Sequence, residues 1–303
     1  ATVSVFLRDS DGQMQLVQTL RAGDAGLAQL AGAQSVRVSA DQKWLYVAAD
    51  AGLLVFNRTT DGNLTLAAQL DGATTLEGQI GDLVSSGDRV YLAAGDSVYL
   101  FRQAADGTMT QVAQYADIDG LQNANRLLLS ADGRFLFASG MGSQTQLSVL
   151  AIAGDGRLSV VDSLKASDAD TFYATAAMAV SADGKTLYVL DNYADAVLGI
   201  FTVGTDGTLQ RVGEQAVNSA ANDLIVTANG SAVIVVGKVI EVFSRGDDGR
   251  LQVVSGAPQL QLLANSLGGL SLSADGKTLF VAGDFGDEYL VGYDLGLRGQ
   301  HYT

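Results

Sequence analysis

Short runs of alternating apolar and polar residues recur along the chain, and many are joined by Asp-Gly or Asn-Gly. The clearest run, SADGKTLYVL at 181–190, returns almost unchanged as SADGKTLFVA at 273–282. Asp-Gly and Asn-Gly supply the positive φ of a tight hairpin turn, and the flanking β-branched and aromatic residues suit strands. Each copy therefore predicts a strand, a turn and a second strand.

This hairpin is repeated, and a second hairpin follows most copies. Copies recur about every 47 residues, a spacing typical of repeat folds. They begin at Val38, Ser85, Leu129, Val180, Val226 and Leu272, and the turns of the second hairpins hold Asp-Gly at Asp61, Asp106, Asp155, Asp206 and Asp248. Four antiparallel strands per period, a to d, are typical of a β-propeller blade.

The two ends of the chain predict how such a propeller closes. TVSVFLRDSDGQMQLVQ, from Thr2, has the pattern of strands c and d without a preceding a and b, and residues 269–295 predict a, b and a c-like strand. We expect these segments to pair in one blade, which removes exposed sheet edges, and we expect 296–303 to be irregular. The sequence thus predicts an all-β chain with one propeller domain over 1–303, of six blades or, alternatively, seven.

The combined pattern S-A-D-G-K/R-x-L-Y/F-V, then V-x-x-F-x-x-x-x-D-G-x-L, resembles the lactonase-type seven-bladed propeller repeat along essentially the whole chain. The resemblance implies either a 6-phosphogluconolactonase-like enzyme or a module of a very large bacterial secreted or surface protein. Such a repeat specifies blades and leaves activity open, because function depends on sites carried by the fold.

Composition narrows the classes of partner. The formal net charge is −15 and the chain has no cysteine. Scattered Lys and Arg in an acidic chain disfavour nucleic acid and anionic membranes as partners. Without cysteine there are no disulfides and no thiolate nucleophile. No apolar run reaches the length of a membrane helix, and the first residues lack the features of a signal peptide.

Candidate binding residues lie in the variable d to a and b to c connections, because variable loops on a rigid scaffold usually carry the site. The candidates are Asn123, Asn125, Arg126, Asp168, Asp170, Phe172, Tyr173, Asp191, Asn192, Tyr193, Asp195, Asp284, Phe285, Asp287 and Glu288. Arg126 either meets an anion in the channel or pairs with a carboxylate of a neighbouring blade.

Two of these loops are rich in carboxylates. Asp191, Asp195, Asp284 and Asp287 would suit Ca²⁺, which takes six to eight oxygen ligands, although neither loop spells an EF-hand. The alternative is that these loops are capped, solvated turns. We expect no other cofactor.

The catalytic inventory is small, because the one histidine is His301, three residues from the end. The family resemblance implies an Arg, Glu and His set, and the histidine has no counterpart here. Nucleophilic schemes that need a histidine base therefore fail. We predict a monomeric, non-catalytic binding module of an extracellular or surface bacterial protein, with its loop face toward a protein or glycan. The alternatives are a lactonase-like hydrolase of a sugar lactone, a structural spacer, and a periplasmic or cytoplasmic location.

Overall fold

β-Strands form nearly all the regular structure of the computed structural model, which describes residues 1–303 except 11–12, 72–75, 117, 119–120, 142–146, 165–173, 193–195, 218–220, 255–265, 274, 285–289, 295–297 and 303. The chain divides into two compact units. Unit 1 holds Ala1–Leu129 and Phe135–Lys165, and unit 2 holds Ser130–Arg134 and Ala166–Thr303. The single propeller domain over 1–303 stays a prediction.

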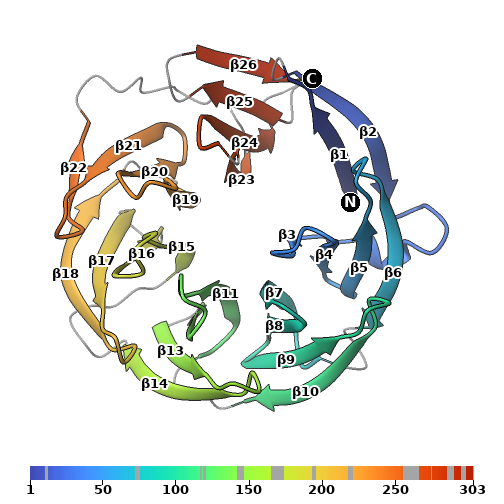
Figure 1. The fold of residues 1–303 in the computed structure, drawn as a ribbon, viewed down its shortest axis with the longest axis horizontal. Helices are drawn as coiled ribbons and strands as arrows, with labels where there is room; N and C mark the ends of the chain where they lie inside the picture. The colour runs from blue at the N-terminus through green and yellow to red at the C-terminus, as the bar shows by residue number, and fades with distance from the viewer. Residues whose placement is uncertain are drawn as a thin grey trace. The chain divides into compact units, whose positions relative to one another are not determined.

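The described part of unit 1 contains fourteen strands and one short 3₁₀ helix, Ala28–Leu30. The course of the chain through these strands can be followed in Figure 1. The strands are β1 (Thr2–Arg8), β2 (Met14–Arg21), β3 (Ser35–Val38), β4 (Trp44–Ala49), β5 (Gly52–Arg58), β6 (Leu64–Asp71), β7 (Ile80–Ser86), β8 (Arg89–Ala94), β9 (Ser97–Gln103), β10 (Met109–Tyr115), β11 (Ala124–Leu129), β12 (Phe135–Gly140), β13 (Leu147–Ile152) and β14 (Leu158–Leu164).

The described part of unit 2 contains twelve strands. They are β15 (Thr175–Val180), β16 (Thr186–Asp191), β17 (Val197–Val203), β18 (Leu209–Ala216), β19 (Asp223–Val226), β20 (Ala232–Val236), β21 (Ile240–Arg245), β22 (Leu251–Val253), β23 (Ser266–Leu272), β24 (Thr278–Asp284), β25 (Leu290–Asp294) and β26 (Arg298–Tyr302).

The described strands form one two-stranded sheet, β1-β2, and six four-stranded antiparallel sheets. Each four-stranded sheet is a run of four consecutive strands, as the repeat predicts. The predicted pairing between the chain ends is wrong: β25 pairs with β26, and β1 pairs with β2. The cause is the segment after Asp294, which we expected to be irregular but which supplies β26 as a fourth strand. The sheets therefore number seven, in agreement with the seven-bladed alternative.

Hydrogen bonds inside the first turn of four repeats explain why the Ser-Ala-Asp phrase recurs. The Ser181 hydroxyl donates to Asp183 (2.5 Å), and that carboxylate accepts the N–H of Lys185 (3.1 Å). The Ser181 oxygen also accepts the N–H of Thr186 (2.9 Å). Gly184 has a φ of 70°, a conformation that glycine adopts without steric cost. The same Ser-Asp bond forms at Ser39–Asp41, Ser130–Asp132 and Ser273–Asp275.

These turn carboxylates are held in the ionised form. The Arg134 guanidinium and the Ser130 hydroxyl, both hydrogen-bonded to Asp132, lower the pKa of that carboxyl to about 2. Because hydrogen bonds to the charged form favour it, Asp132 stays ionised at pH values below the usual range of a carboxyl group. The turn acids are therefore structural groups of the hairpins.

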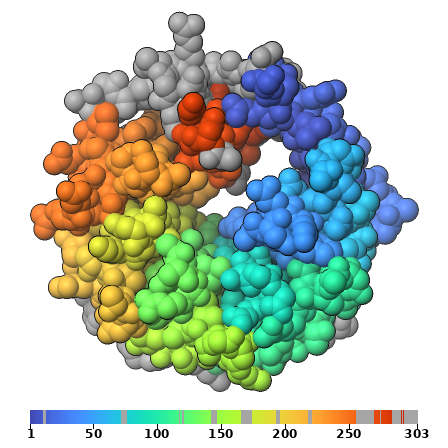
Figure 2. Space-filling view, in the orientation of Figure 1, coloured from blue at the N-terminus to red at the C-terminus, as the bar shows by residue number. Residues whose placement is uncertain are grey.

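The cores lie between neighbouring sheets. In unit 1, Tyr46, Val55, Leu92 and Phe101 belong to one buried cluster shared by the sheets β3–β6 and β7–β10. A second cluster joins β7–β10 to β11–β14. In the space-filling view these three sheets meet without a gap (Figure 2). The middle strands are mostly apolar because both of their faces are covered.

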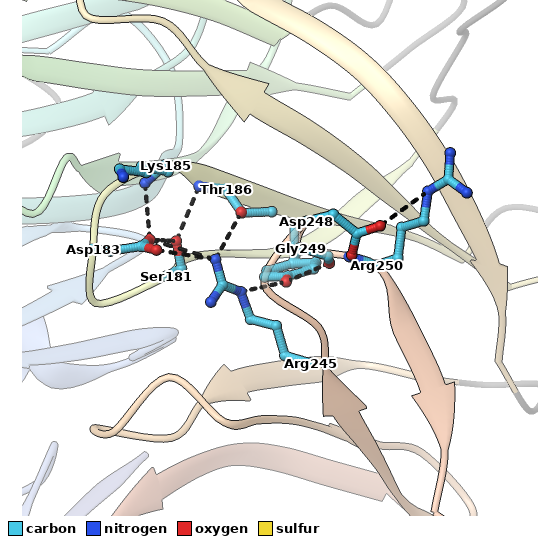
Figure 3. A network of polar contacts seen from close by, with 9 residues as sticks. Ser181, Asp183, Lys185, Thr186, Arg245, Asp248, Gly249 and Arg250 are labelled. Carbon is cyan, nitrogen blue, oxygen red and sulfur yellow. Dashed lines mark hydrogen bonds and ion pairs between the residues drawn. The ribbon is translucent and has the colours of Figure 1, made fainter.

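Unit 2 has a polar clasp between two of its sheets (Figure 3). Arg245, at the end of β21, donates to the Tyr188 hydroxyl (3.1 Å), to the Thr186 hydroxyl (3.1 Å) and to Asp183 (3.2 Å). The Tyr188 hydroxyl donates to the Gly249 carbonyl (2.8 Å). Asp183 and Gly249 both lie in repeat turns, so the uniform turns also join one sheet to the next.

Candidate functional site

One position in the first strand of each described four-stranded sheet varies, whereas the residue that follows it is always apolar. Strand pairing defines this position, because in every sheet it lies opposite the same residue of the second strand. That residue comes three positions after a Leu or Val of the second strand, and it is Ala48, Ala93, Ser139, Leu190, Val236 or Ala282. The position holds Ser35, Asp82, Arg126, Ala177, Asp223 and Gly269. Polar groups therefore gather on the first strands of unit 1.

In unit 1 these first strands are β3, β7 and β11, which lie side by side (Figure 1). Close approach is possible because β7 carries Gly81. A Cβ at Gly81 would lie 2.7 Å from the Asn125 Cα on β11, closer than real Cβ contacts come. The main chains of two sheets are thus brought together at this point. We name Ser35, Arg37, Asp82, Asn125 and Arg126 the first-strand cluster.

Asp82 is the centre of the first-strand cluster. Its side chain is 2% exposed, and its carboxylate forms an ion pair with Arg37 on β3 (2.9 Å). It also accepts the Ser35 hydroxyl (3.1 Å) and the N–H groups of Leu83 (2.8 Å) and Leu127 (3.3 Å). A buried carboxylate needs such partners because an unpaired buried charge is costly. Asp82 therefore links three neighbouring sheets.

The Arg37 side chain is anchored by hydrogen bonds but remains partly exposed to solvent. Its guanidinium is bound to Asp82 and to the Val36 carbonyl (3.2 Å), yet 46% of the side chain is exposed. A guanidinium has five N–H donors in a planar fork. The anchored Arg37 thus presents donors to solvent in a fixed orientation.

Arg126 lies on β11, next to Leu127, whose N–H donates to Asp82. The Arg126 guanidinium donates to the carbonyl and the side-chain oxygen of Asn125 (3.1 and 3.2 Å). Arg37, which the sequence reasoning missed, pairs with a carboxylate of the neighbouring sheet; the two roles predicted for Arg126 stay predictions. On these first strands two arginines stand against one carboxylate, so the cluster is cationic within an acidic chain. Such a site suits carboxylate or phosphate oxygens, or a carbonyl that develops negative charge.

Asn123 makes structural contacts at the entry to β11, and its predicted binding role stays a prediction. Its φ is 47°, its N–H donates to Asp96 (2.8 Å), and its amide donates to the Met141 carbonyl (3.3 Å). Asn is among the residues that adopt a positive φ most readily. Asn123 thus shapes the entry to β11 and joins it to the previous sheet.

Asp191 and Asn192 of unit 2 also make structural contacts. Asp191 is buried and accepts the N–H of Ala174 (3.3 Å), and the Asn192 amide donates to the Ala221 carbonyl (3.2 Å) of the next sheet's entry. Asp284 ends β24. The remaining candidates, Asp168, Asp170, Phe172, Tyr173, Tyr193, Asp195, Phe285, Asp287 and Glu288, lie outside the described residues.

The described residues hold no group of three or more His, Asp or Glu side chains able to bind a metal. Two of the four predicted calcium ligands, Asp195 and Asp287, are outside this set, so calcium stays a prediction. No helix in the described part of the chain has the length and apolar character needed to cross a membrane.

A family model described as "Lactonase, 7-bladed beta-propeller" matches residues 96–262. No curated protein matches the chain. The family match agrees with the resemblance seen in the repeat, and together with the seven sheets it confirms the predicted all-β propeller, in its seven-bladed form.

Solved structures share the fold at low sequence identity. A putative 6-phosphogluconolactonase from Bacteroides fragilis is 20% identical over 86% of this chain and 78% of that one, with a TM-score of 0.72. A periplasmic gluconolactonase from Pseudomonas aeruginosa is 23% identical over 84% and 76%, with a TM-score of 0.67. A functionally unknown protein from Desulfotomaculum acetoxidans is 14% identical over 99% and 91%, with a TM-score of 0.73.

Proposed function

Because the chain belongs to the lactonase family of seven-bladed β-propellers, we propose that it hydrolyses a sugar lactone bound at the first-strand cluster. The observation that carries the proposal is Arg37 of β3, which the buried Asp82 of β7 fixes in place and which is still half exposed. The strand β7 also lies beside β11, which carries Arg126. The gluconolactonase-like neighbours add support, because they make a lactone the first substrate class to test.

Lactone hydrolysis is helped by hydrogen-bond donors that point at the carbonyl oxygen of the lactone. Lactone hydrolysis joins a water oxygen to the carbonyl carbon and breaks the bond from that carbon to the ring oxygen. One water proton ends on the released hydroxyl, and the acid product gives a proton to solvent. Negative charge develops on the carbonyl oxygen, where fixed donors are most effective. In the proposal, Arg37 and Arg126 donate to this oxygen and to the product carboxylate.

Asp82 acts as a positioning residue in this scheme. Besides the ion pair with Arg37 it accepts three hydrogen bonds, from Ser35, Leu83 and Leu127, so its oxygens are occupied in holding Arg37 and two strands. The proposal therefore assigns Asp82 to positioning and not to activation of the attacking water. The first-strand cluster thus supplies binding and charge stabilisation.

A second candidate function follows because the Asp82 oxygens are already hydrogen-bonded. Asp82 is the one carboxylate on β3, β7 and β11. A site with two guanidinium groups and an occupied carboxylate suits retention of a sugar acid without hydrolysis. This is the binding-module interpretation, with a sugar acid as the ligand.

The test is proton release at constant pH with glucono-δ-lactone and with its 6-phosphate, after subtraction of the spontaneous rate. We expect turnover, and a loss of about 10- to 100-fold in kcat/KM for Arg126→Ala, the effect of removing one charged hydrogen bond. Arg37→Lys keeps a positive charge beside Asp82 and should lose activity while melting normally. Arg157→Ala is the matched control, because Arg157 pairs with Asp155 in an exposed turn.

Two outcomes separate the candidates. Calorimetric binding of gluconate without lactone turnover, lost in Arg126→Ala, favours the binding module. Turnover that is equal in Arg126→Ala, Arg37→Lys and Arg157→Ala would move the active site away from the first-strand cluster.

A further inference from the structure

The first strand β11 contains a β-bulge that sets the direction of Arg126. The β11–β12 ladder shifts register between Ala124 and Arg126, so Asn125 is the extra residue and Arg126 lies opposite Ser139. The β7–β8 ladder shifts in the same way just before Asp82. Bulges are frequent next to active sites, where they re-aim a side chain. The residue across from the β11 bulge, Ser139, is therefore placed to act on the first-strand cluster.

The Ser139 hydroxyl is buried and makes no hydrogen bond. Ser139 is 0% exposed, and among the described residues its Oγ has no hydrogen-bond partner. An unsatisfied buried hydroxyl costs free energy, so its presence needs a reason. The scaffold does not require it, because this position is apolar in the other described four-stranded sheets. The residues there are Ala48, Ala93, Leu190, Val236 and Ala282.

Arg126 can reach this hydroxyl. Directly opposite residues of an antiparallel ladder have Cβ atoms about 4.5–5.5 Å apart on one face of the sheet. The stem of an arginine is long enough to bring its Nε to the Oγ of the residue opposite. In the structure the guanidinium lies along its own strand, on the carbonyl and side-chain oxygen of Asn125 (3.1 and 3.2 Å). Arg126 thus has a second hydrogen-bond acceptor, Ser139, across the ladder.

The Arg37–Asp82 pair shows what an anchor of this kind does. Asp82 binds the Arg37 guanidinium (2.9 Å), and the Arg37 side chain stays 46% exposed. A guanidinium has five N–H donors in a rigid fork, so one bond at its base fixes the direction of the others. A buried hydroxyl opposite Arg126 can anchor that arginine in the same way through a single N–H.

We propose that Ser139 is a positioning residue for Arg126. When a carboxylate or lactone oxygen binds, Arg126 turns away from Asn125, and its Nε–H donates to the Ser139 Oγ. The ligand then replaces the Asn125 oxygens at the outer nitrogens, and the buried hydroxyl gains its partner. Because that hydroxyl is satisfied in the bound state, the ligand shifts Arg126 toward this position. The inference rests on the proposed function, since it takes Arg126 as the group that binds the ligand.

The variant Ser139→Ala tests the proposal on the full chain. Calorimetry should show gluconate binding weakened about tenfold, the effect of losing one hydrogen bond to a charged group. The same variant should raise the melting temperature by about 1–3 °C, because it removes an unsatisfied hydroxyl from the free protein. A serine with a merely structural role would lower the melting temperature when replaced.

Ser148→Ala is the matched control. Ser148 is equally buried in the same sheet, but its hydroxyl lies 3.4 Å from that of Ser163. This variant should therefore melt at a lower temperature than the unchanged chain and bind gluconate with the same affinity.

A double-mutant cycle shows whether Ser139 acts through Arg126. In the Arg126→Ala background, Ser139→Ala should cause no further loss of gluconate affinity or of lactone turnover. Equal losses in both backgrounds, or a lower melting temperature for Ser139→Ala, would overturn this inference alone. An unchanged chain that neither binds gluconate nor hydrolyses the lactone would instead count against the proposed function.

Discussion

At the scale of single residues, the polar groups of the repeat turns hold the scaffold together. Ser181 and Asp183 close their own hairpin, and Asp183 also receives Arg245 from the next sheet. Partial burial opposes the charge on Asp183, but hydrogen bonds from Ser181, the Lys185 N–H and Arg245 lower its pKa overall. The turn acids are thus structural, which explains why their abundance does not mark a site.

Arg245 and Arg250 allow a matched test of this interpretation. The side chain of Arg245 is 10% exposed and that of Arg250 is 69% exposed, and each is paired with a turn aspartate (Figure 3). We expect Arg245→Ala to lower the free energy of unfolding by about 1–3 kcal/mol, because several partly buried partners lose a donor. Arg250→Ala should change it by less than about 0.5 kcal/mol, as for exposed ion pairs.

Urea unfolding of the two variants, followed by circular dichroism, measures both values. Equal destabilisation by the two substitutions would show that burial of the clasp adds nothing.

At the scale of elements, hairpins were predictable and the packing between sheets was not. The Asp-Gly turns and their alternating flanks identify most of the strands, because turn chemistry and strand pattern are local. β26 escaped prediction because RGQHY lacks both the apolar alternation and the turn signal. Arg37 and Asp82 escaped because their pairing depends on which first strands lie side by side, and that is set by inter-sheet contact.

The close approach of β7 and β11 can be tested at Gly81. An alanine there would place its Cβ against the backbone of Ala124 and Asn125, which cannot swing aside. We expect Gly81→Ala to cost about 1–3 kcal/mol of unfolding free energy, the usual range for overpacking. Gly213→Ala, in β18, is the matched control, since an added Cβ there meets nothing within 4 Å.

Thermal melting of both variants gives the comparison. If Gly81→Ala has the same melting temperature as Gly213→Ala and the unchanged chain, β7 and β11 are further apart than the structure has them.

At the scale of the whole molecule, an acidic chain places two arginines on the first strands of unit 1. The repeat builds the seven sheets with nearly uniform hairpins, and the variable position of each first strand differs from sheet to sheet. Asp82 and Asp223, at that position, bond the N–H of the next first strand, at Leu127 and Leu270. The sequence could predict Arg126 as a candidate, but only the strand register shows that it shares a position with Asp82.

The central claim is that the first-strand cluster binds the sugar acid or lactone, and a crystal structure of the protein with 6-phosphogluconate tests it most directly. We expect the ligand on β3, β7 and β11, with its carboxylate within hydrogen-bond distance of the Arg37 or Arg126 guanidinium and with the Arg37–Asp82 pair intact. A ligand bound elsewhere, with both guanidinium groups untouched, would contradict the account.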